Sequence, residues 1–125
     1  MATITEDYVS FETAKLLKEK GFYKPCYRHY DNKGDICGKY VNPDIPFNYS
    51  SVEYYLCPSQ AMVMKWLRKI YGIDIVIEIS DPSVKDRKYY CVIWDGNNNS
   101  HILDLFNSNE EACEAAIKYC LGKII

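Results

Sequence analysis

The stretch CPSQAMVMKWLRKIYGIDIVIEIS, residues 57–80, decides the fold because it encodes a helix that leads directly into a strand. Apolar residues recur every three or four positions and define one face of the helix. This face consists of Val63, Trp66, Leu67 and Ile70. Pro58 suits the first helical position, and Gly72 suits the left-handed residue that ends a helix. Isoleucine at every second position from 73 to 79 then predicts a strand with one apolar face.

Two further helices are indicated, one on each side of this segment. Ser10 is suited to cap the first helix, and Gly21 is suited to end it. Ser108 and Glu111 form an S-x-x-E capping box at the start of the last helix. We expect Gly122 to end that helix, because glycine is the usual residue just after a helix.

A hairpin is predicted around the turn motif DNKG, residues 31–34, which separates two extended segments. We expect Tyr30 to face Asp35 across this turn, which would place Cys26 diagonal to Cys37 on one face. Diagonal pairs usually lie too far apart for a disulfide, so the sequence predicts two free thiols.

The remaining strands follow the central one along the chain. Residues 89–95, YYCVIWD, are apolar on both faces and predict an interior strand that is covered on both sides or packed against a partner. After a turn at 96–100, residues 101–106 predict the next strand. The order α-β-β-α-β-β-β-α is typical of an α+β fold, with an antiparallel sheet and helices packed on one face. We expect residues 1–125 to form a single domain.

Composition narrows the class of protein. The net charge is -2, which argues against a dedicated binder of duplex DNA, so nucleic acid is a minority hypothesis. The first ten residues lack a signal-peptide pattern, and no apolar stretch approaches the ~20 residues of a membrane span. We therefore expect a cytoplasmic protein without membrane attachment. Six cysteines without any C-x-x-C motif favour buried thiols over a zinc site, and no cofactor is expected.

The best candidate for a contact surface is the segment at residues 42–56. It is too apolar for a flexible linker, and long loops in compact domains are commonly functional or packed down as a lid on the core. The chain also holds 12 tyrosines, whose rings with polar tips suit contact surfaces and also suit a tyrosine-rich sheet. The predicted partner-contact residues are Phe47, Tyr49, Tyr54 and Tyr55.

Catalytic chemistry has few candidates. Cys57 lies just before a helix start, where the dipole can stabilise a thiolate, but it would need His29 or His101 as a base. His101 could also pair with Asp104, or with Asp95 across the Asn-rich turn, as an acid–base pair or a metal site. The spacing matches no known metal or catalytic motif, so we expect neither an enzyme nor a metal centre.

A basic stripe on the central helix suggests a ligand site instead. Lys65 and Arg68, with the aromatic ring of Tyr71 nearby in sequence, could hold a phosphate or a nucleotide. The alternative is a solvated helix face whose aromatic residues turn inward, and the sequence favours that alternative.

Three stretches resemble a group of small uncharacterised proteins encoded by phages, prophages and mobile elements of gut Bacteroides-type bacteria. They are VSFETAKLLKEKGF (9–22), CPSQAMVMKWLRKIYGI (57–73) and NEEACEAAIKYCL (109–121). The group carries a PTQ…KWLRE helix and a closing YEEACEAAIKYCLE helix. Ser59 here stands for the usual Thr, and Lys69 for the usual Glu. The resemblance implies a small accessory protein of a phage or mobile element and supplies no site residues.

Three hypotheses of function follow. The first is a non-catalytic binding protein that contacts a host or phage macromolecule, with counter-defence as one such role. The second is a protein that sequesters a nucleotide signal, and the third is a nucleic-acid binder. A homo-oligomer fits all three, because the strand at residues 89–95 could pack between subunits.

Overall fold

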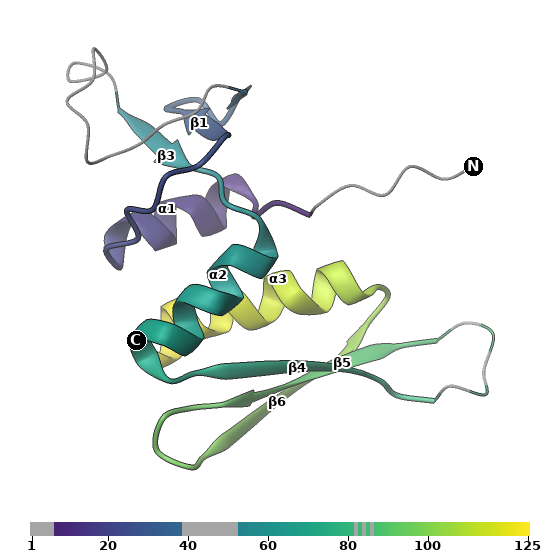
Figure 1. Cartoon of the computed structure of the whole chain (residues 1–125). Helices are drawn as coiled ribbons and strands as arrows, with labels where there is room; N and C mark the ends of the chain where they lie inside the picture. Colours follow the sequence, from purple (N-terminus) through teal and green to yellow (C-terminus); the bar gives the residue numbers. More distant parts are fainter. Residues whose placement is uncertain (1–6, 39–52, 82, 84, 86) are drawn as a thin grey trace. The chain divides into compact units, whose positions relative to one another are not determined.

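The computed structural model describes residues 7–38, 53–81, 83, 85 and 87–125 (Figure 1). The chain divides into two compact units, residues 1–59 and 60–125, and each unit is described by itself. Each unit combines helix with a three-stranded antiparallel sheet, which confirms the predicted α+β class. The expected single domain stays a prediction, because two compact units can still unfold as one cooperative domain.

The first unit begins with helix α1, Phe11–Glu19, and both of its ends form as predicted. The hydroxyl of Ser10 accepts a hydrogen bond of 3.2 Å from the amide three residues later, as an N-cap does. At the other end Gly21 adopts a left-handed φ of 83°, and the Phe22 amide donates to the Leu17 carbonyl. Phe22 and Leu17 are both buried, so the end of the helix is fixed in the core of this unit.

The sheet of the first unit has the order β2-β1-β3, and its hairpin register differs from the prediction by one residue. The strands are β1 (His29–Asp31), β2 (Ile36–Cys37) and β3 (Tyr54–Leu56). Tyr30 pairs with Ile36 and not with Asp35. The Asp31 amide donates to the Asp35 carbonyl, so the loop has three residues, 32–34, in place of the expected four, and Gly34 closes it with a left-handed φ of 89°.

This shift also corrects the expected arrangement of the thiols. Cys37 pairs with His29, an odd number of residues from Cys26, so the two cysteines do not form the predicted diagonal on one face. The conclusion drawn from that diagonal nevertheless holds, because Cys26 and Cys37 are both free thiols.

Strand β3 was not predicted. Tyr55 pairs with Tyr30 of β1, and the strand completes the sheet on the side away from β2. The sequence suggested only an apolar loop over residues 42–56, because Pro43 and Pro46 obscured the short strand that follows them. A strand of three residues gains its stability from a partner distant in sequence, and local patterns do not report such pairing.

The second unit begins with the helix encoded by the segment that decides the fold. It comprises α2, Gln60–Trp66, and a continuing π-helical turn η1, Leu67–Tyr71. Three of the four residues assigned to its apolar face are buried, namely Val63, Trp66 and Leu67. Ile70 is 59% exposed, so its assignment to the core was wrong. The wider π turn advances each residue by a smaller angle than an α turn does, which carries Ile70 off the buried face.

The two ends of this helix also refine the prediction. Gly72 ends it in a left-handed conformation with a φ of 67°, as expected. The next residue, Ile73, is buried and donates its amide to the Leu67 carbonyl, so it replaces Ile70 in the core. Pro58 lies two residues before the helix and does not occupy its first position.

The sheet of the second unit has the order β4-β5-β6, with β5 in the centre. The strands are β4 (Asp74–Ile79), β5 (Tyr89–Trp94) and β6 (Ser100–Phe106). Ile75, Cys91 and Ile93 point to the inner face and are buried. Helices α2 and α3 lie on this face of the sheet in Figure 1, and α3 contacts all three strands. Strand β5 is therefore central in its sheet and covered on its inner face, whereas the predicted cover of its second face stays a prediction.

Helix α3, Asn109–Tyr119, begins with the predicted Ser108 cap, and the Glu111 side chain bonds one residue earlier than in a capping box. The Ser108 hydroxyl accepts from the Glu111 amide at 3.1 Å, and the Glu111 carboxylate accepts from the Asn107 amide at 3.0 Å. The helix does not end at Gly122 as predicted. A π-helical turn η2, Cys120–Ile124, continues through this glycine, which stays outside the left-handed region.

An irregularity marks the end of β6, where two residues oppose one on β5. Tyr90 pairs with Asp104 and Tyr89 pairs with Phe106, so Leu105 is the extra residue of a β-bulge. Leu105 has a φ of 68° and is 70% exposed. A branched side chain strains the backbone of a residue in the left-handed region. Because Leu105 is mostly exposed, burial of its side chain offsets little of this strain energy.

Leu105→Gly should therefore stabilise the protein by about 1 kcal/mol, because glycine adopts a positive φ without strain. Urea denaturation of the variant and the parent measures the difference. Ile102→Gly is the matched control on the same strand, since it removes an exposed apolar side chain in ordinary extended backbone and should destabilise. Loss of stability in both variants would contradict strain at Leu105.

Candidate functional site: an open sheet face

The outer face of the second unit's sheet is an apolar surface, and no helix covers it among the described residues of this unit. Strand pairing aligns its residues in three rows across β4, β5 and β6. The rows are Asp74, Trp94 and Ser100; Val76, Val92 and Ile102; and Glu78, Tyr90 and Asp104. These nine residues are called the outer face from here on. Its central row consists entirely of β-branched aliphatic side chains.

The apolar residues of the outer face are substantially exposed. Val76 is 40% exposed, Trp94 is 48% exposed and Ile102 is 64% exposed. Single exposed apolar residues are ordinary on a protein surface, but these adjoin one another through direct strand pairing. A contiguous apolar patch of this kind is typical of an interaction site.

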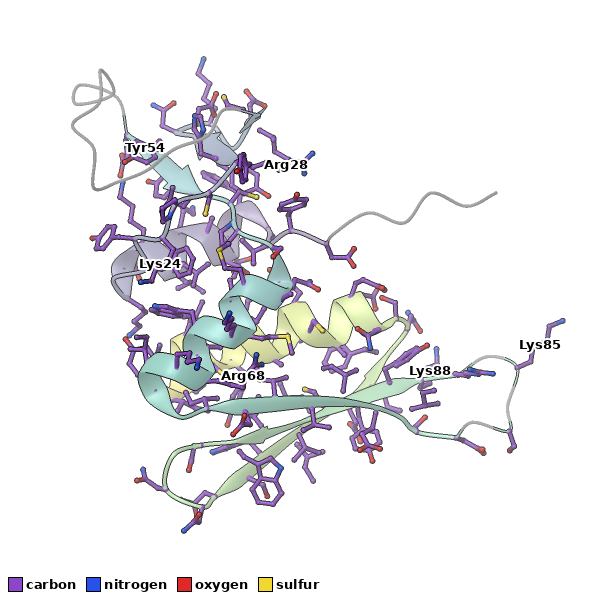
Figure 2. The ribbon with its side chains drawn as sticks, viewed as in Figure 1. Lys24, Arg28, Tyr54, Arg68, Lys85 and Lys88 are labelled. Carbon is purple, nitrogen blue, oxygen red and sulfur yellow. The ribbon has the colours of Figure 1, made fainter. Side chains whose placement is uncertain are left out.

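The charged residues among the nine of the outer face are all acidic. Asp74, Glu78 and Asp104 are exposed and have no ion-pair partner within the part of the chain that the structure describes. None of the nine outer-face positions is Lys or Arg. Lys88 lies just before β5, and its ammonium group donates a hydrogen bond to the Asn107 side chain (Figure 2). The outer face is therefore an apolar row bordered by carboxylates.

The local sequence explains why this face is apolar. Strand β5 carries apolar residues at every position, so both of its faces need cover. Helix α3 covers the inner face through Cys91 and Ile93, whereas the opposite face lies open among the described residues of this unit. The sequence predicted that this strand is covered on both faces or packed against a partner. It did not predict the row, because Val76 sits among Asp74 and Glu78 on the polar side of its own strand.

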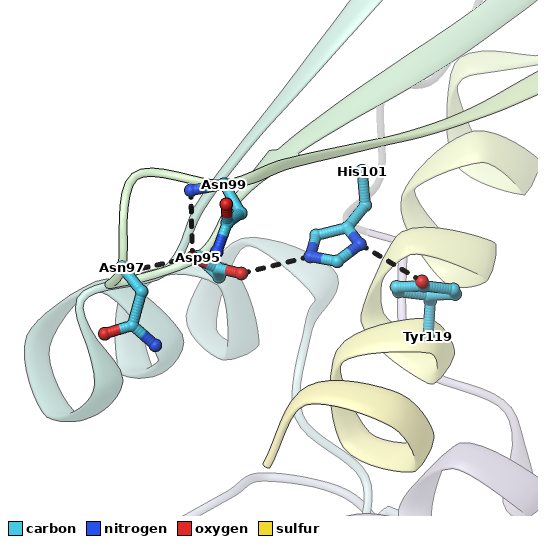
Figure 3. Close-up of polar contacts among 5 residues, drawn as sticks. All are labelled: Asp95, Asn97, Asn99, His101 and Tyr119. Atoms are coloured by element: carbon cyan, nitrogen blue, oxygen red, sulfur yellow. Dashed lines mark hydrogen bonds and ion pairs between the residues drawn. The ribbon is translucent and has the colours of Figure 1, made fainter.

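A second cluster joins the β5–β6 turn to helix α3 (Figure 3). The Nε2 atom of His101 lies 3.1 Å from a carboxylate oxygen of Asp95, and its Nδ1 atom lies 3.2 Å from the Tyr119 hydroxyl. The Asp95 carboxylate also accepts the amides of Asn97 and Asn99. The hydrogen bond from His101 and then that from the Asn97 amide lower the pKa of Asp95.

This cluster has a positioning role in the fold. Both ring nitrogens of His101 are engaged, because Nε2 faces the Asp95 carboxylate and Nδ1 faces the Tyr119 hydroxyl. The suggested pairing of His101 with Asp104 was wrong, because residues three apart on a strand point to opposite faces. The pairing with Asp95 was anticipated, but Tyr119 was missed, since no local pattern links a strand to a distant helix.

The predicted contact tyrosines take part in the packing of the first unit. Tyr55 lies edge-on against the Phe11 ring at 5.4 Å, and its hydroxyl donates to the Glu53 carboxylate. Tyr54 accepts a hydrogen bond from the Lys18 ammonium group through its carbonyl and lines a small apolar pocket beside α1. Both tyrosines are half-buried, and their role in partner contact stays a prediction. Phe47 and Tyr49 lie outside the described residues.

The basic stripe of the central helix is solvated. Lys65 and Arg68 are exposed, and the Tyr71 ring lies edge-on against Trp66 at 5.3 Å. Trp66 turns inward, as the alternative to a ligand site proposed. A nucleotide role for these residues stays a prediction.

The buried thiols of Cys26 and Cys120 lie in surroundings that suppress their reactivity. Cys57 is buried beside strand β1, and its thiol contacts the Val9 carbonyl at 3.6 Å. Burial, with a smaller effect of the Cys57 thiol, raises the pKa of Cys26 to about 12. Burial, with a smaller effect of Cys91, likewise raises the pKa of Cys120 to about 12. Such thiols stay protonated at neutral pH and are poor nucleophiles.

The described residues also bear on metal binding and on membrane insertion. Within these residues no group of three or more His, Cys, Asp or Glu side chains is placed to hold a metal ion. Among them, too, no helix has the length and apolar character to cross a membrane.

Comparison of the chain with protein-family models, with curated proteins and with solved structures finds no match. These comparisons therefore assign no site and no activity to this chain.

The buried thiols predict how stability changes at alkaline pH. The folded pKa of Cys120 is about 12 against 9.0 for an ordinary thiol, so the folded state holds its proton while the unfolded chain loses it. This stabilisation is complete below pH 9 and is lost as the pH rises from about 9 towards 12. At pH 10 the loss should reach about 1 kcal/mol for this thiol.

Urea denaturation at pH 7.5 and pH 10 of the parent protein and Cys120→Ala measures this effect. The parent should lose more unfolding free energy between the two pH values than the variant does, whatever the variant's stability at pH 7.5. An equal loss in the two proteins would show that Cys120 is not held in its protonated form.

Proposed function

We propose that this protein is a non-catalytic binding protein and that a macromolecular partner docks on the outer face. The observation that carries this proposal is the central row, in which Val76, Val92 and Ile102 adjoin one another at the surface. Burying such side chains against a partner removes apolar area from water, which is the main favourable contribution to protein association.

Trp94 strengthens the case for binding at this surface. Tryptophan is enriched among the residues that contribute most to binding energy, because its large ring buries much area with few rotatable bonds. Here the ring is 48% exposed and lies one row away from the aliphatic residues. Tyr90 flanks the opposite side of the row, so two aromatic residues border the aliphatic centre.

The resemblance to phage and mobile-element proteins supports an accessory role for this binding. The partner would then be a host or phage macromolecule in the bacterial cytoplasm, and counter-defence is one role that such binding would serve. The fold supplies a rigid platform for it, because α3 fixes all three strands from the inner face.

Purification of the tagged protein from a bacterial host, followed by native mass spectrometry, tests the proposal. Val76→Ser with Ile102→Ser should reduce the recovered complex at least tenfold, a difference equivalent to about 1.4 kcal/mol of binding energy. These exposed substitutions should change the unfolding free energy by about 0.5 kcal/mol or less each.

The matched control is Ile36→Ser with Ile70→Ser, which removes two aliphatic side chains of similar exposure outside the outer face. The control should keep the complex at the parent level. Retention of the complex by both double variants would overturn docking on the outer face.

A further inference from the structure

We infer that the outer face binds a short amphipathic helix whose apolar stripe is flanked by Lys or Arg. This inference rests on the proposed function and names the chemistry of the partner. It is drawn from the three carboxylates that border the apolar row and from the absence of Lys and Arg among the nine outer-face residues. An incoming basic side chain on either side of an apolar stripe would meet an acidic partner there.

The geometry favours a helix over a strand as the docked element. A strand binds by adding backbone hydrogen bonds at a sheet edge, whereas the outer face presents side chains only. The central row crosses three strands and is therefore roughly 10 Å wide, since neighbouring strands lie ~4.8 Å apart. Trp94 and Tyr90 extend the apolar surface along β5 by four residues, or about 13 Å. One helix of two to three turns, about 11–16 Å long, covers an area of this size.

A second copy of the chain fits the outer face less well. Two outer faces packed against each other would bring Asp74, Glu78 and Asp104 of both copies into one interface without any base from the nine positions. Like charges in such an interface oppose association. The face also has nine residues, whereas a stable interface usually takes about 20–30 residues from each partner.

Two designed peptides test the charge requirement directly. One is a 14-residue amphipathic helix with a leucine stripe flanked by lysine, and the other replaces every lysine with glutamate. Trp94 serves as the reporter in Trp66→Phe, which leaves it as the only tryptophan. The basic peptide should shift the Trp94 emission to shorter wavelength and bind at least tenfold more tightly than the acidic peptide. Higher salt should weaken this binding.

Charge variants of the protein test whether the carboxylates of the outer face cause the preference for the basic peptide. Asp74→Asn with Glu78→Gln and Asp104→Asn should weaken binding of the basic peptide about tenfold, as expected for three exposed ion pairs. The matched control removes three exposed acids elsewhere, by Asp7→Asn with Glu19→Gln and Asp35→Asn. This control has the same net charge as the first variant and should bind like the parent.

The results of these experiments test the basic helix as the partner separately from docking on the outer face. Equal binding of the two peptides, or equal weakening by the two charge variants, would overturn the basic helix as the partner. So would a dimer in sedimentation experiments that Ile102→Ser dissociates, because the face would then bind a second copy. In each case the loss of the cellular complex in Val76→Ser with Ile102→Ser would still decide the proposed function independently.

Discussion

The pairing of β5 with a neighbour on each side is the constraint on which the second unit depends. A strand hydrogen-bonded along both edges must alternate its side chains between two faces, and β5 is apolar at every position. Helix α3 buries Cys91 and Ile93 on one face, and the same pairing then places Val92, half-buried, and Trp94, exposed, on the other side. The open apolar surface is thus a direct consequence of how the core is built.

The features around this sheet hold the surface in place. The His101 cluster ties the β5–β6 turn to α3, and the bulge at Leu105 ends the regular pairing of β6. Neither feature requires the outer residues to be apolar. At these exposed positions, polar side chains would be solvated more favourably than apolar ones. Neither feature accounts for the aliphatic row, and we propose that the row serves binding.

Sequence patterns predicted the elements far better than the site. The capped helices and the isoleucine strand are local signals, so Ser10, Gly72 and Ser108 marked their boundaries reliably. Ile70 and Gly122 were misassigned because π-helical turns change the angle per residue without a sequence signature. The row Val76–Val92–Ile102 joins residues from three strands, and only their register brings them together. A glycine in the turn shifted the one register that was predicted.

The most direct test of this account is acrylamide quenching of tryptophan fluorescence in the free protein. The chain has two tryptophans, so Trp66→Phe reports Trp94 on the outer face, and Trp94→Phe reports Trp66 in the core. The account predicts a quenching constant several-fold higher for Trp94, which is 48% exposed against 8% for Trp66. Equal, weak quenching of both residues would show that the outer face is already covered in the free protein and would contradict its role as an open docking surface.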